Sequence, residues 1–130
     1  MGRFAMTNLK EVEDSAPRFG FAPALEARFP RGALGLERVG LSYQRLAPNA
    51  RLPFGHRHRE QEEVYVVVAG SGRVNLDGEV RDVREWDAIA VPPGTARCFH
   101  AGPDGLAFLA FGTSTGGMAD VESLPDWWGG

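Results

Sequence analysis

Residues 55–70 carry the sequence GHRHREQEEVYVVVAG, in which one residue separates two histidines and glutamates follow them. On an extended segment, side chains two positions apart point to the same face, so His56 and His58 are expected to lie together. The carboxylate of Glu63 can turn toward that face. Two imidazoles and one carboxylate bind a divalent transition metal and leave coordination positions open. This segment therefore predicts a metal site of His56, His58 and Glu63.

Short segments of alternating polarity surround the histidines, with glycine- and proline-containing turns between them. The valine-rich run that begins at Glu63 favours a buried strand, and Asp77-Gly78 is a strong hairpin signal. The predicted strands are residues 41–46, 63–69, 73–76, 79–83, 88–91, 97–100 and 106–111. Turns are expected at 70–72, 92–94 and 102–105, and residues 24–29 form one turn of helix at most. Many short strands with turns between them indicate an all-β sandwich or barrel.

Length, charge and cysteine content limit the possible classes of protein. A chain of 130 residues is expected to form a single domain, residues 1–130, with a barrel at about 35–112, an N-terminal arm at 1–34 and a C-terminal tail at 113–130. A net charge of −3 without a basic cluster argues against nucleic acid as a partner. No apolar stretch reaches the ~20 residues of a membrane helix, and no signal-peptide pattern is present. The single Cys98 fits a reducing compartment, so the expected location is cytoplasmic.

Other catalytic classes lack their motifs. The chain has no Gly-x-Ser-x-Gly elbow and no phosphate-binding glycine-rich loop with its lysine. Its one lysine, Lys10, lies in the N-terminal arm. The tail ends in Trp127-Trp128, and paired tryptophans are seldom exposed to water, so they are expected to cover the same molecule or a dimer partner.

Residues 55–70 and 86–97 together resemble the two motifs of the cupin superfamily. In the first, four residues separate His58 from Glu63, and six separate Glu63 from Gly70. In the second, the Pro-x-Gly turn appears as Pro92-Pro93-Gly94. The resemblance implies a double-stranded β-helix, or jelly-roll barrel, with short terminal extensions and a pocket at the mouth of the barrel. It also implies a homodimer and a small-molecule ligand.

The second motif departs from the metal-binding pattern of the family. Members that bind metal usually have a histidine where this chain has Arg97, and an asparagine where it has Ala101. His100 is three residues from Arg97, an odd offset, so a regular strand directs the two side chains to opposite faces. His100 is therefore expected to lie outside the pocket.

Three hypotheses follow from this departure. In the first, His56, His58 and Glu63 bind iron, manganese, nickel, copper or zinc, and Arg97 binds an anionic ligand beside the metal. An enzyme built in this way would be an oxygenase, isomerase or lyase. In the second, the guanidinium repels the dication, Arg97 pairs with Glu63, and the barrel is a metal-free sensor or carrier of small molecules. In the third, the pocket has no function and the protein acts through its outer surface or tail.

Two aromatic residues are further candidates for the ligand pocket. Tyr65 shares the strand parity of Glu63, and Phe99 shares that of Arg97. Each can therefore line the pocket, and for each the alternative is packing in the core. For Arg97 the alternative is a surface arginine.

Overall fold

The computed structural model of the chain describes residues 3–113, 120–125 and 128. Its elements, in chain order, are η1 (Leu9–Glu11), η2 (Ala16–Phe19), β1 (Leu25–Arg28), α1 (Arg31–Leu34), β2 (Val39–Leu46), β3 (Phe54–His58), β4 (Glu63–Leu76), β5 (Glu79–Arg84), β6 (Ala88–Val91), β7 (Arg97–Thr113) and β8 (Val121–Pro125). Strands dominate, and each described helix is about one turn long. The prediction of an all-β fold is confirmed.

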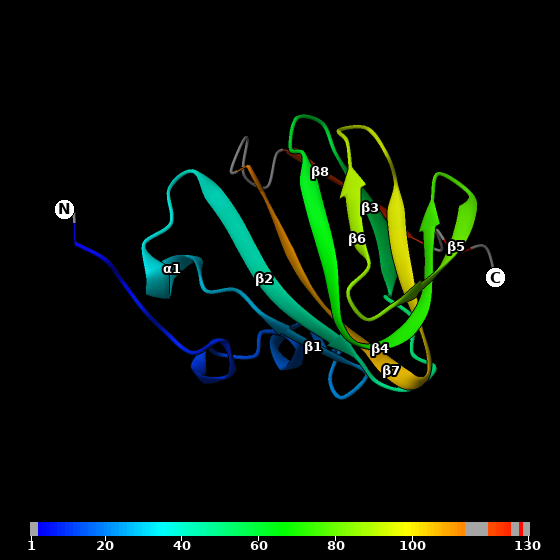
Figure 1. The fold of residues 1–130 in the computed structure, drawn as a ribbon, viewed down its shortest axis with the longest axis horizontal. Helices are drawn as coiled ribbons and strands as arrows, with labels where there is room; N and C mark the ends of the chain where they lie inside the picture. The colour runs from blue at the N-terminus through cyan, green and yellow to red at the C-terminus, as the bar shows by residue number, and fades with distance from the viewer. Residues whose placement is uncertain (1–2, 114–119, 126–127, 129–130) are drawn as a thin grey trace.

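The strands form one antiparallel sheet that curls back on itself (Figure 1). Its order is β1-β2-β7-β3-β8, and β4 also pairs with β5, β6 and β7. The C-terminal half of β7 pairs with β2 and with the first half of β4. Its N-terminal half pairs with the second half of β4 and meets β3 where His56 lies opposite Arg97. Strand β7 therefore connects both halves of the barrel and places Arg97 beside the histidine strand.

Two bent strands occupy the positions where turns were predicted at 70–72 and 102–105. Strands β4 and β7 continue through these segments, with register shifts on both sides of Gly70. Gly70 and Gly105 have φ of 76° and 81°. A Cβ on Gly70 would lie 2.1 Å from the Gly105 carbonyl oxygen, so no side chain fits there. These glycines bend two paired strands without ending them, and both turn predictions are wrong for that reason.

The other two predicted turns do connect strands. Asp77 and Gly78, between β4 and β5, both have positive φ, at 52° and 93°, as a type I′ hairpin requires. After β6, the backbone N–H of Gly94 donates to the carbonyl oxygen of His58 at 2.7 Å. The Pro92-Pro93-Gly94 turn therefore holds the end of the strand that carries the histidines.

The segment 24–29 is a strand and not a turn of helix. Leu25–Arg28 forms β1, which pairs with the C-terminal half of β2. Leu25 and Ala27 are buried against the sheet. Pairing and burial of these side chains outweigh a helical preference that a segment of this length expresses only weakly. The short helix of this region, α1, begins after Pro30.

The core fills the inside of the curled sheet. Aromatic rings pack at its centre, where Phe99 and Phe108 stack with ring centroids 4.5 Å apart. Aliphatic side chains from four strands complete it: Leu46, Val67, Val74, Val91 and Leu106, each at most 1% exposed. Close packing of this kind gives the barrel its stability, since replacing such a phenylalanine with alanine typically costs about 3–5 kcal/mol.

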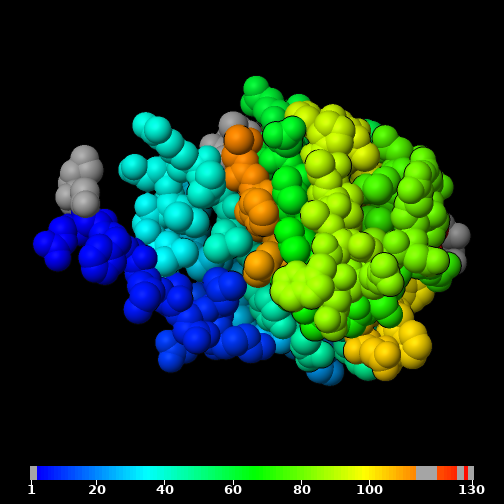
Figure 2. Space-filling view, in the orientation of Figure 1, coloured from blue at the N-terminus to red at the C-terminus, as the bar shows by residue number. Residues whose placement is uncertain are grey.

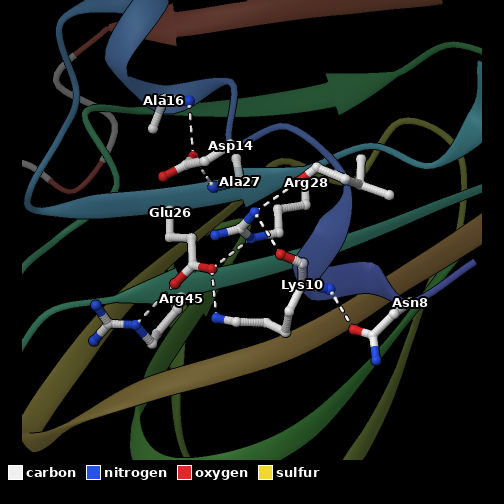
Figure 3. A network of polar contacts seen from close by, with 9 residues as sticks. Asn8, Lys10, Asp14, Ala16, Glu26, Ala27, Arg28 and Arg45 are labelled. Carbon is white, nitrogen blue, oxygen red and sulfur yellow. Dashed lines mark hydrogen bonds and ion pairs between the residues drawn. The ribbon is translucent and has the colours of Figure 1, made fainter.

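The N-terminal arm is held to the sheet by polar contacts around Glu26 (Figure 3). The carboxylate of Glu26 accepts hydrogen bonds from Lys10 at 2.6 Å, Arg28 at 2.6 Å and Arg45 at 3.2 Å. The carboxylate of Asp14 accepts from the backbone N–H of Ala27 at 2.9 Å. Beyond these anchors, the first described residues of the arm, dark blue in Figure 2, stand away from the barrel.

Strand β8, from the predicted tail, belongs to the sheet. It pairs with β3 along five consecutive residues, from Phe54–Pro125 to His58–Val121. Arg57 and Glu122 add two hydrogen bonds across this pair, at 2.9 and 3.0 Å. Of the two tryptophans that were expected to cover the molecule or a dimer partner, Trp127 lies outside the described part of the chain. The ring of Trp128 meets His100 edge-on at 5.6 Å. No helix among the described residues is long and apolar enough to span a bilayer.

Candidate metal centre

Strands β3 and β4 bring the three predicted metal ligands together. His56 and His58 alternate with Arg57 on β3 and share one face, with ring centroids 5.1 Å apart. Glu63 begins β4. One possible ligand atom from each residue lies within 4.8 Å of the other two. The expectation that these three side chains converge is confirmed.

One carboxylate oxygen is the point on which the cluster converges. Glu63 Oε1 lies 3.8 Å from His56 Nε2 and 3.7 Å from His58 Nε2. These separations are longer than hydrogen bonds. The same oxygen accepts a hydrogen bond of 2.6 Å from the Tyr65 hydroxyl. The carboxylate is thus held in place on one side, while the space between it and the two histidines is not closed by hydrogen bonds.

Arg97 lies inside the barrel beside this carboxylate. It is 0% exposed, which excludes the surface arginine considered above. Its Nη2 is 3.7 Å from Glu63 Oε1, so the expected ion pair is present, but without a hydrogen bond. Among the described residues none is a hydrogen-bond partner for its Nε, Nη1 or Nη2. A buried guanidinium with all three nitrogens unsatisfied is costly, and it calls for an acceptor.

Asp120, immediately before β8, is a member of the site that the sequence did not indicate. Its Oδ2 lies 3.1 Å from His58 Nδ1. It also accepts the backbone N–H groups of Glu60, at 2.7 Å, and Gln61, at 3.2 Å. Asp120 is 62 residues from His58 in a glycine-rich segment that has no strand pattern. No local signal in the sequence connects the two residues.

The environment adjusts the protonation of these groups. Burial lowers the pKa of His58, and the charges of His56 and Arg97 lower it further. Glu63 and Asp120 act to raise it, but the net shift is downward. Burial works to raise the pKa of Glu63, but His56, the Tyr65 hydroxyl and Arg97 outweigh it, so the pKa is lowered. Burial and Glu63 raise the pKa of Tyr65 well above its ordinary value. At neutral pH these shifts favour a neutral His58 imidazole, an ionised Glu63 carboxylate and a protonated Tyr65 phenol.

The two aromatic candidates belong to the core. Tyr65 is 2% exposed, and its ring lies 4.9 Å from that of Phe99 and 5.5 Å from that of Phe108. Phe99 is 1% exposed. Core packing accounts for both rings. Only the Tyr65 hydroxyl reaches the cluster, through its bond to Glu63, and the guanidinium of Arg97 lies 5.9 Å from its ring. A ligand contact for either residue remains a prediction.

His100 and Cys98 lie apart from the cluster. In the described part of the chain, the group that could hold a metal does not include His100. Its Nε2 instead faces the Asn49 carbonyl oxygen at 3.2 Å, in agreement with the parity argument. Cys98 is buried, and burial raises the pKa of its thiol to about 11, so the thiolate is scarce at neutral pH.

The residues fit a divalent transition metal. Two donors bound at about 2.0–2.2 Å to one tetrahedral ion lie roughly 3.4 Å apart. The observed separations of 3.7 and 3.8 Å from Glu63 Oε1 to the two Nε2 atoms need only small adjustments. The contact between Asp120 and His58 Nδ1 leaves Nε2 as the ligand atom. The spacing of these donor atoms therefore matches the coordination of a single metal ion.

Comparisons with known proteins agree with this architecture. Over 40 residues, 31% of this chain and 32% of the relative, the sequence is 40% identical to an uncharacterized protein of Methanocaldococcus jannaschii. A cupin protein of Bacteroides fragilis has a similar structure, with a TM-score of 0.72 at 22% identity over 91% of this chain and 90% of that one. A sugar phosphate isomerase of Silicibacter pomeroyi from the cupin superfamily follows, with a TM-score of 0.70 at 23% identity over 85% and 76%.

At such identities the two solved structures show the fold alone. The family assignment comes from the sequence, because the model of the family described as "Cupin domain" matches residues 42–111. This range is more than half of the chain. It contains His56, His58, Glu63, Arg97 and the Pro92-Pro93-Gly94 turn. The chain belongs to the cupin domain family.

Proposed function

We propose that this cupin barrel binds a divalent transition metal through His56, His58 and Glu63, together with a small anionic ligand at Arg97. The observation that carries the proposal is that two imidazole nitrogens face one carboxylate oxygen at 3.7 and 3.8 Å. These distances are too long for hydrogen bonds and near those between donors that share an ion. A metal bound here would supply Lewis-acid chemistry at an open coordination position.

The charge balance supports an anionic ligand. The ionised Glu63 and Arg97 cancel, so a dication leaves two positive charges in excess within a largely buried site. An anion reduces this excess, and a carboxylate or similar oxyanion offers acceptors to the unsatisfied guanidinium nitrogens of Arg97. If the protein is an enzyme, its reaction falls among oxygenases, isomerases and lyases.

A metal-free sensor or carrier is the second candidate, and one observation favours it. Arg97 is completely buried 3.7 Å from the carboxylate oxygen that a metal would use. Two unit charges 4 Å apart repel by about 4 kcal/mol at an effective dielectric of about 20, and a dication doubles this. Two histidines and a fixed carboxylate at ligand spacing weigh against this candidate, because a simple anion site does not require them.

Metal analysis separates the two candidates. We expect protein purified without chelator to contain near-stoichiometric iron, manganese, nickel, copper or zinc, or to take up one of these ions on titration. His58→Ala should lose this binding. His100→Ala is the matched control, because its ring lies outside the cluster, and it should keep the wild-type metal content. Wild-type protein that stays metal-free with every ion would overturn the proposal in favour of the second candidate.

We further propose that the chain forms a homodimer, in the cytoplasm. Exposed apolar side chains at the arm and at the adjoining sheet support an apolar contact with a second copy: Phe4 at 86%, Met6 at 90%, Val39 at 50% and Phe111 at 40%. The first described residues of the arm, dark blue in Figure 2, stand away from the barrel, where a partner can reach them. Light scattering should give twice the chain mass, and Phe4→Ser with Met6→Ser should shift the protein toward monomer. A wild-type monomer at high concentration would contradict the dimer.

A further inference from the structure

Strand β3 carries both histidines but has little pairing with the barrel itself. Its register with β7 is limited to one pair, His56 with Arg97. Along its other edge it pairs with β8 over its whole length. The two hydrogen bonds between the side chains of Arg57 and Glu122 strengthen the pairing along this second edge. Strand β8 therefore supplies most of the strand pairing that orients the histidine strand.

Asp120 lies where β8 begins, and it is tied to the histidine end of β3 by four contacts. Its carboxylate meets His58 Nδ1 and the N–H groups of Glu60 and Gln61. Its carbonyl oxygen accepts the N–H of Arg59 at 2.9 Å. The side chain is nearly inaccessible, with Asp120 3% exposed. It closes the connection between β3 and β4, and both strands supply metal ligands.

The contact with His58 has a chemical consequence beyond packing. An ionised carboxylate can only accept hydrogen bonds, so the facing Nδ1 must carry the proton. In the neutral ring Nε2 then holds the lone pair, and this is the atom that faces Glu63 Oε1 at 3.7 Å. A carboxylate that fixes an imidazole in this tautomer orients it for metal binding and increases its basicity.

We propose that Asp120 is a positioning residue for the metal site, which fixes His58 in the Nδ1–H tautomer, and that β8 is the brace that carries Asp120 to this position. The inference rests on the proposed function of the cluster. It assigns a role to a part of the chain outside the 42–111 range of the cupin domain.

Asp120→Asn tests the tautomer directly. The amide oxygen can keep the bond from the Glu60 N–H at 2.7 Å, which is shorter than the bond from the Gln61 N–H at 3.2 Å. In this orientation the NH₂ group replaces Oδ2, donates to His58 Nδ1 and gives up the bond from Gln61. We expect ¹⁵N NMR of the metal-free protein to show His58 shifted from the Nδ1–H form toward the Nε2–H form. Zn²⁺ affinity should fall by roughly 10–100-fold, the usual effect of losing a partner of a metal-bound histidine.

Two further variants separate positioning from folding. Asp120→Ala should weaken Zn²⁺ binding without imposing the Nε2–H form. Asp14→Asn is the matched control, because this carboxylate also accepts two backbone N–H groups, those of Ala16 and Ala27, but lies in the N-terminal arm. It should bind Zn²⁺ within about twofold of wild type. Thermal unfolding identifies variants that are folded. An unchanged His58 tautomer in folded Asp120→Asn would overturn the inference, even if Zn²⁺ binds. If wild-type protein binds no Zn²⁺, the proposed function fails, while the tautomer measurement still decides the role of Asp120.

Discussion

Two glutamates in this protein each lie among three nitrogen-bearing side chains, and only one of them is satisfied. Around Glu26, the nitrogens of Lys10, Arg28 and Arg45 approach to 2.6, 2.6 and 3.2 Å. Around Glu63, those of His56, His58 and Arg97 stay at 3.8, 3.7 and 3.7 Å. The first cluster is a closed set of hydrogen bonds. The second has the same kind of components held about 1 Å further apart.

This difference separates a structural cluster from a candidate functional one. At Glu26 the charges are mutually satisfied, and the product is a fixed N-terminal arm. At Glu63 the strands prevent the partners from closing, and Arg97 keeps three unsatisfied nitrogens. A folded protein tolerates such a cost at a site that a ligand or metal completes. The predictions below test this contrast.

The largest effect is expected for Arg97→His. This change removes the buried cation and adds an imidazole at the same position of β7. Metal affinity should increase at least 100-fold, about 2.7 kcal/mol, because removal of the repulsion alone is worth several kcal/mol. Calorimetric titration with Zn²⁺ or Ni²⁺ measures the change. Unchanged affinity would mean that spacing, and not charge, limits metal binding at Glu63.

Glu26→Gln should reduce stability without affecting the metal site. The change removes three charge-assisted hydrogen bonds, and we expect the free energy of unfolding to fall by about 2 kcal/mol. Urea denaturation measures this loss, and the same protein should bind Zn²⁺ with wild-type affinity. A loss of metal binding would show that the two clusters are coupled, contrary to the contrast drawn above.

Lowering the pH should reveal how much the Glu26 cluster contributes to the stability of the wild-type protein. Burial works to raise the pKa of Glu26, but its hydrogen bonds to Lys10, Arg28 and Arg45 lower it from 4.5 to about 2. Because the pKa is lower in the folded state, this stability is present above pH 4.5 and is lost as the pH falls toward 2. We expect a loss of about 1–2 kcal/mol, reduced by the exposure of Lys10 to solvent. The difference in stability between wild type and Glu26→Gln should shrink over this range, and a constant difference would contradict the assignment.

Tyr65→Phe should have the smallest effect. It removes the hydrogen bond of 2.6 Å from the Tyr65 hydroxyl to Glu63 Oε1 and leaves the packed ring in place. We expect a destabilisation of about 1 kcal/mol and a change in metal affinity of less than about tenfold. Denaturation and Zn²⁺ titration measure the two quantities. A complete loss of metal binding would give Tyr65 a direct part in the site.

Local patterns in the sequence predicted a large part of the fold. Alternation and turn chemistry were sufficient for most strands and for the Asp77-Gly78 hairpin. They failed at Gly70 and Gly105, because the same glycine preference for positive φ serves a turn and a bend within paired strands. Which of the two forms depends on the strand opposite, where the Gly105 carbonyl lies against Gly70.

The candidate site also has features that follow from local sequence and features that depend on contacts between distant segments. By itself, the sequence determined that His56 and His58 share a face and that Glu63 follows at the family spacing, because side-chain direction in a strand is a local property. Only the tertiary structure decided that Arg97 is buried against Glu63, that β8 pairs with β3, and that Asp120 meets His58 across 62 residues. Contacts between distant segments depend on the closure of the sheet, and no local pattern encodes them.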